Sequence, residues 1–131
     1  MPMLAFAALL AAAAPTPACL DVRSGNAPVA LEGRLERATF SMRDIGNGRP
    51  EREYVLILRR PICVDDGGEF ADPHRRFNQV QLFTSNDRLW PSLRTGLGHR
   101  IRIRGSGFAA QTAHHHTPLV VDVSAITRLR R

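Results

Sequence analysis

The sequence contains no lysine, and all 18 of its basic residues are arginine. A bias this complete indicates GC-rich coding rather than chemistry, so a single arginine is weak support for a contact. Aromatic residues are also scarce, at 6% of the chain, whereas proteins that bind single-stranded nucleic acid stack its bases on aromatic side chains. The composition therefore argues against nucleic acid as a partner.

The signatures of several enzyme classes are missing as well. The sequence has no nucleophile elbow, no recognisable pair of catalytic carboxylates and no Gly-rich phosphate loop. Its only two cysteines, Cys19 and Cys63, are expected to be oxidised, which would remove any thiol nucleophile. We therefore predict that the chain is not an enzyme.

One long apolar run is present, and it lies at the N-terminus. Leu4 to Ala14 is uncharged, too short to span a membrane, and of the right length for the central region of a signal peptide. Thr16 and Ala18 would occupy the −3 and −1 positions of a cleavage site before Cys19. A buried N-terminal helix is the alternative, but no polar face interrupts the run.

These features predict a signal peptide over residues 1–18 and a single mature domain over residues 19–131 that has no transmembrane span. Met1-Pro2-Met3 carries none of the basic residues that usually open a signal, which is compatible with a start upstream of Met1 or with a weak signal. The expected location is the periplasm or the exterior of the cell.

The two cysteines fit such a compartment, because an even count in an oxidising environment predicts a disulfide. A Cys19–Cys63 bond would close a loop of about 45 residues and contribute about 4 kcal/mol in the chain-entropy model. The alternative is a lipidated Cys19, but bacterial lipoprotein signals usually place leucine where this chain has Thr16. Lipidation would also leave Cys63 unpaired.

Hydrophobic periodicity predicts five strands and one helix. The helix is expected over residues 85–98, where Leu89, Leu93 and Leu97 recur at helical spacing and Trp90 is interpreted as a core or lid residue rather than a stacking platform. The strands are expected over residues 28–40, 53–60 and 79–84, and on each side of the loop within residues 98–126.

This order predicts a mainly β fold: a small five-stranded OB-like Greek-key barrel with one short helix between the third and fourth strands. Gly33 and Gly105 lie inside predicted strands and suit the bends that such a barrel requires. An open five-stranded sheet with a packed helix is the alternative architecture.

Several segments together resemble a known but uncharacterised family. They are Cys19, V-A-L-E-G-R-L, P-I-C-V, V-Q-L, L-G-H-R-I-R-I-R-G and T-A-H-H-H-T-P-L-V. The chain resembles small exported bacterial proteins that share a domain of unknown function, except that the loop Ser41 to Arg52 looks shorter and lacks their aromatic residue. The resemblance implies export and a shared fold, and it supplies no activity.

The most distinctive loop carries three consecutive histidines, His114, His115 and His116. In an extended segment the first and third would point the same way, and two such imidazoles could bind a transition metal such as zinc or copper. A third ligand would be needed, for which His99, His74 or an acidic residue is the candidate. The alternatives are a loop that is polar only because it is solvated, and imidazoles that hydrogen-bond the loop backbone.

A second candidate site is a stripe of arginines on one strand face, Arg100, Arg102 and Arg104, in a domain that carries the whole net charge of +6. Such a stripe could bind an anionic envelope polymer. An OB topology would instead place Glu32 and Glu36 on the neighbouring strand, where a ladder of ion pairs explains the same residues without a ligand.

The function predicted from the sequence is therefore a small exported binding or protective module of the bacterial cell envelope, with an unknown ligand. One alternative is a metal-binding protein that uses the histidine loop. Another is an inhibitor or immunity-type protein that docks a partner enzyme through this loop. An envelope protein or an anionic polymer is the expected partner.

Overall fold

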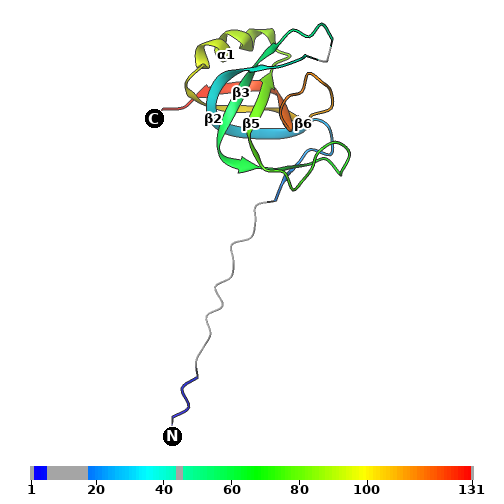
Figure 1. The fold of residues 1–131 in the computed structure, drawn as a ribbon. Coiled ribbons are helices and arrows are strands. Elements are labelled where there is room, and N and C mark those ends of the chain that lie inside the picture. The colour runs from blue at the N-terminus through cyan, green and yellow to red at the C-terminus, as the bar shows by residue number, and fades with distance from the viewer. Residues whose placement is uncertain (1, 6–17, 44–45, 131) are drawn as a thin grey trace.

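A computed structural model describes residues 2–5, 18–43 and 46–130 (Figure 1). Most of the predicted signal peptide, residues 1–18, lies outside these ranges. Within them, no helix is long and apolar enough to cross a membrane.

The structure is mainly β, as predicted. Its strands are β1 (Leu20–Asp21), β2 (Ala27–Phe40), β3 (Glu51–Ile62), β4 (Val64–Asp65), β5 (Phe77–Phe83), β6 (Arg100–Ala109) and β7 (Leu119–Arg128). One 3-10 turn, η1 (Asp87–Leu89), leads into the short helix α1 (Trp90–Gly96). Asn86 caps this turn by accepting a hydrogen bond from the backbone N–H of Arg88 at 3.2 Å.

The five long strands form one sheet in the order β2-β3-β5-β7-β6, and β6 pairs with β2 to close it into a barrel. All neighbours are antiparallel except β5 and β7, which run parallel. The helix α1 lies at one end of the barrel (Figure 1).

The sequence-based order overlooked β1 and β4, because two-residue strands show no periodicity. Its placement of the helix between the third and fourth strands is therefore wrong for the chain as a whole. The helix lies between β5 and β6, which are the third and fourth strands of the barrel only.

Two glycines make the barrel's bends possible. Gly33 pairs with Leu58 of β3 and with Ile101 of β6, so β2 changes neighbours at this residue. A Cβ atom there would lie 2.4 Å from the carbonyl oxygen of Ile57. Gly105 lies at a register shift between β6 and β7, and its Cβ would lie 2.1 Å from the carbonyl oxygen of Asp122. Neither position can hold a larger residue without movement of the backbone.

The core fills the barrel, and the period-2 pattern of β6 shows how the sequence produces it. Ile101 and Ile103 are fully buried, whereas Arg100, Arg102 and Arg104 are exposed. Other fully buried side chains come from the remaining long strands and from α1, among them Leu35, Leu56, Val80, Leu82, Leu93 and Leu119.

The predicted disulfide is present. Cys19 and Cys63 are bonded, with their Cα atoms 4.6 Å apart. Next to the bond, β1 and β4 pair in parallel, with Leu20 opposite Val64. The disulfide thus fixes the start of the domain to the end of β3.

Candidate functional site

The histidine loop, residues 110–118 between β6 and β7, is held against β5 by a buried amide. The side chain of Gln81 donates to the carbonyl oxygen of His114 at 3.0 Å and accepts from the backbone N–H of His116 at 2.7 Å. The backbone N–H of Gln81 donates to Oγ1 of buried Thr117 at 2.8 Å. Three hydrogen bonds from one residue thus position the segment that carries the histidines.

His115 makes its hydrogen bonds within the loop itself. Its Nδ1 accepts hydrogen bonds from the backbone N–H groups of Gln111, at 3.0 Å, and Thr112, at 3.3 Å. Its ring packs edge-on against Phe108, with 5.1 Å between ring centroids. Burial lowers the pKa of His115 below its usual value, and the charges of the adjacent histidines lower it further. One of the three imidazoles therefore fixes the loop's shape through its backbone.

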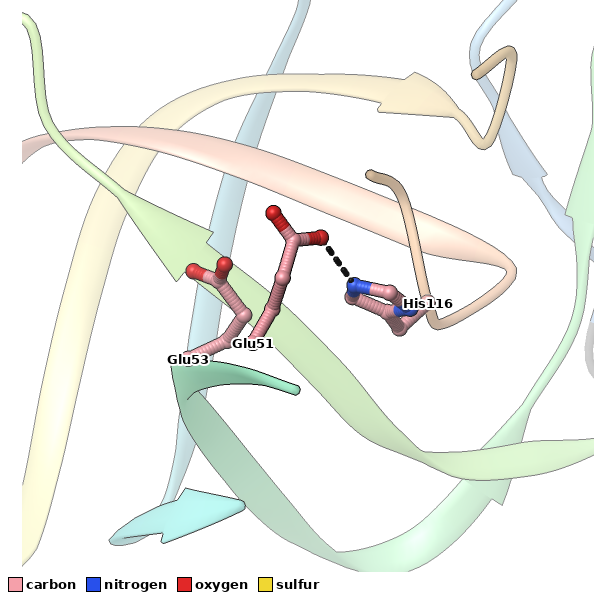
Figure 2. Close-up of side chains that lie close together, drawn as sticks. All are labelled: Glu51, Glu53 and His116. Atoms are coloured by element: carbon pink, nitrogen blue, oxygen red, sulfur yellow. Dashed lines mark hydrogen bonds and ion pairs between the residues drawn. The ribbon is translucent and has the colours of Figure 1, made fainter. Parts of the chain in front are cut away.

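The other two imidazoles meet on one carboxylate, that of Glu51 at the start of β3. Nδ1 of His114 lies 2.8 Å from Oε2 of Glu51 and 3.0 Å from Oε1. Nε2 of His116 lies 2.9 Å from the same Oε1, the contact that Figure 2 shows. His116 also stacks on Phe40, with 4.3 Å between ring centroids and 3° between ring planes. Only 9% of the His116 side chain is exposed, against 68% of that of His114.

A second carboxylate lies beside this pair. Glu51 and Glu53 are two residues apart on β3 and project to the same side, as Figure 2 shows. One ligand atom from each of them and one from His116 lie within 4.8 Å of one another. Two carboxylates and an ordered imidazole thus converge, with His114 at the rim.

The two carboxyl groups have opposite electrostatic surroundings. The hydrogen bond with His116 lowers the pKa of Glu51 most, and the hydrogen bond with His114 lowers it further. Burial raises the pKa of Glu53, and the neighbouring charge of Glu51 adds to the effect. Among the described residues Glu53 makes no hydrogen bond or ion pair through its carboxyl group. The site therefore contains a half-buried carboxylate that a cation would stabilise.

The structure brings His114 and His116 together on Glu51, although the expected extended segment is replaced by a turn in which the backbone N–H of His115 donates to the carbonyl oxygen of Thr112. It does not bring His99 to them. The carbonyl oxygen of His99 accepts a hydrogen bond from the backbone N–H of Leu35 at 3.0 Å. Leu35 lies five residues along β2 from Phe40, the residue on which His116 stacks. Neither His99 nor His74 belongs to the cluster of potential ligands found among the described residues.

Sequence reasoning missed Glu51, because it assigned that residue to the loop before the second strand. The signal available was the motif E-R-E in residues 51–53, since alternating carboxylates at the start of a strand lie on one face. It also missed Gln81, because the alternating segment Q-V-Q at residues 79–81 looks like part of any strand and does not single this residue out.

Arg102, at the centre of the arginine stripe, forms an ion pair within the barrel. β2 and β6 are antiparallel neighbours, and Glu32 lies directly opposite Arg102. Nε of Arg102 donates to the Glu32 carboxylate at 2.8 Å, and Nη2 contacts the same oxygen. Glu36 pairs instead with Arg34, at 2.7 Å. The expected cross-strand ion pair is confirmed for Glu32 and Arg102, which weakens the case for a polymer-binding stripe.

Two comparisons with known proteins bear on this region. A family described as "Domain of unknown function (DUF4431)" matches residues 79–127. The match spans β5 to β7, so it includes Gln81 and the histidine loop but not Glu51 or Glu53. No curated protein matches the chain.

Proposed function

We propose that the protein is an exported metal-binding module of the cell envelope, in which Glu51, Glu53, His114 and His116 hold a divalent transition metal such as zinc. The observation that carries the proposal is that one carboxylate, Glu51, lies within 3.0 Å of imidazole nitrogens from both histidines. Imidazole and carboxylate together suit Zn²⁺.

The spacing of the donor atoms supports this ligand set. Zinc binds imidazole nitrogen and carboxylate oxygen at about 2.0–2.2 Å, so neighbouring ligands of a tetrahedral ion are roughly 3.3 Å apart. The contacts of Glu51 with His114 and His116, at 2.8–2.9 Å, are slightly shorter than that. Small side-chain rotations would therefore admit an ion, which would take the place of the shared hydrogen bonds.

The electrostatics favour the same function. The burial of Glu53 beside Glu51 raises the pKa of Glu53, which is a cost to the metal-free fold. A divalent cation between the two carboxylates would remove that cost. Stacking on Phe40 and the hydrogen bond from the His116 backbone to Gln81 hold this imidazole in one orientation, which reduces the entropy lost when an ion binds.

The architecture supports a binding module of OB type. The strand order β2-β3-β5-β7-β6, with β5 and β7 parallel, has the connectivity expected of such a barrel. OB barrels bind ligands near the loops that follow their first and fourth strands. The corresponding loops here are residues 41–50 and the histidine loop, and Glu51 directly follows the first of them. The Cys19–Cys63 bond fits export, and we propose no catalytic role.

Calorimetric titration with Zn²⁺ tests the proposal, using protein prepared without a histidine tag. We expect saturable binding of one ion, at least about tenfold tighter than binding to a peptide of residues 110–118, because only the fold adds Glu51 and Glu53. Affinity should fall as the pH is lowered, because an imidazole binds a metal ion only through a deprotonated nitrogen.

Matched histidine variants sharpen the test. His114→Ala combined with His116→Ala should abolish tight binding, whereas His99→Ala combined with His74→Ala should leave it unchanged. Equal losses in both double variants, or binding no tighter than that of the peptide, would rule the site out.

A further inference from the structure

Next to the proposed metal site lies a hollow of about 590 Å³, which shares Glu53 with that site. Three arginines from three different elements line it: Arg37 of β2, Arg52 of β3 and Arg94 of α1. Tyr54 and Trp90 also contribute to its wall. Residues distant in the sequence thus bring three arginines to one cavity.

The guanidinium of Arg37 is held in place before any ligand arrives. It lies over the ring of Tyr54, with 4.4 Å from its central carbon to the ring centroid. Tyr54 is itself buried and packs against Trp90, with 6.1 Å between ring centroids. A guanidinium over an aromatic ring interacts through its charge and can still donate hydrogen bonds from its N–H groups.

The charge around the hollow is unbalanced. Among the described residues, Arg37, Arg52 and Arg94 form no ion pair with any carboxylate, in contrast to Arg102, which pairs with Glu32. Glu53 is the only acidic residue among the seven that line the hollow, against three arginines. The hollow therefore attracts an anion, and three forked donors match a ligand with several oxygen atoms.

We propose that this hollow binds an organic phosphate, with the phosphate group held by Arg37, Arg52 and Arg94 and the organic part packed on Trp90. A phosphate offers three terminal oxygens, which arginine recognises in bidentate fashion. Trp90 is partly buried and lines the hollow, so its ring supplies an apolar contact for a flat group. The inference does not depend on metal binding, since none of the three arginines belongs to the proposed metal site.

The chain's single tryptophan makes the test direct, because its fluorescence reports on this hollow alone. Protein freed of metal by a chelating resin is titrated with phenyl phosphate, with inorganic phosphate and with phenol. A soluble polycarboxylate chelator is avoided, because it would compete for the arginines. We expect a saturable change with phenyl phosphate, weaker binding of inorganic phosphate, and no saturable change with phenol.

Two double variants with the same change in net charge provide the control. Arg52→Gln with Arg94→Gln should weaken phenyl phosphate binding about tenfold or more. Arg59→Gln with Arg60→Gln removes two exposed arginines of β3 that lie outside the hollow, and it should leave binding unchanged. Equal weakening by both variants would mean diffuse attraction to a basic surface and would overturn the site. So would the absence of a saturable change with phenyl phosphate, or an equal response to phenol.

Discussion

At the scale of single residues, three identical neighbours have three different roles. His116 is ordered by Phe40 and Glu51, His115 hydrogen-bonds the loop backbone, and His114 remains largely exposed at the rim. Alternation along the loop predicted that His114 and His116 would share a side. It did not reveal their carboxylate partner, because Glu51 is 63 residues from His114 and is brought there only by the sheet.

The role assigned to His115 can be tested by its titration. Its Nδ1 accepts two backbone N–H groups, so a proton on that nitrogen would face two donors. We expect a pKa below 6.5 for His115 by NMR, and a higher value in a peptide of residues 110–118. Because the folded pKa lies below the unfolded one, the stability contributed by neutral His115 is present above pH 6.5 and declines as the pH falls toward the folded pKa. A folded-state pKa equal to that of the peptide would contradict the assignment.

At the scale of elements, strong periodicity was sufficient to locate the long strands. β2 was predicted at residues 28–40 and observed at Ala27–Phe40, since its alternating pattern is long and ends in turn residues. β3 was predicted at residues 53–60 but spans Glu51–Ile62. The two missing residues at its start include the key carboxylate, so an ordinary boundary error removed Glu51 from the predicted site.

Glycine requirements within the strands were also predictable, and Gly105 offers the sharper test. Its pairing shifts register, because Arg104 lies opposite Ala125 whereas Gly105 lies opposite Val123. Gly105→Ala should lower the free energy of unfolding by about 2 kcal/mol or more, since the new methyl group would meet the Asp122 carbonyl oxygen at 2.1 Å. Urea denaturation measures this, with Ser106→Ala as the neighbouring control. Equal stability of the two variants would show that the bend does not need glycine.

At the scale of the whole molecule, the sequence was most informative about the contacts that hold the barrel together. The two cysteines predicted the disulfide, and the stripe on β6 predicted the Glu32–Arg102 pair once β2 and β6 were assumed to be neighbours. What could not be predicted is how the histidine loop folds onto β3 and β5. That depends on Gln81, Phe40 and Glu51, which come from three strands and share no local pattern.

The same tertiary arrangement produces two candidate sites that share Glu53. One is the carboxylate–imidazole cluster that includes His116, and the other is the arginine-lined hollow beside Trp90. Glu53 belongs to both, so a cation at the first would reduce the repulsion that an anion meets at the second.

The most direct measurement of the central claim is a crystal structure of the mature domain grown with Zn²⁺, with diffraction recorded on both sides of the zinc absorption edge. We predict an anomalous peak about 2.0–2.2 Å from Nε2 of His116 and from a carboxylate oxygen of Glu51. Glu51→Gln crystals treated in the same way should lack it. A peak found only at His74, at His99 or at the chain terminus would contradict the account, as would full retention of the peak in Glu51→Gln.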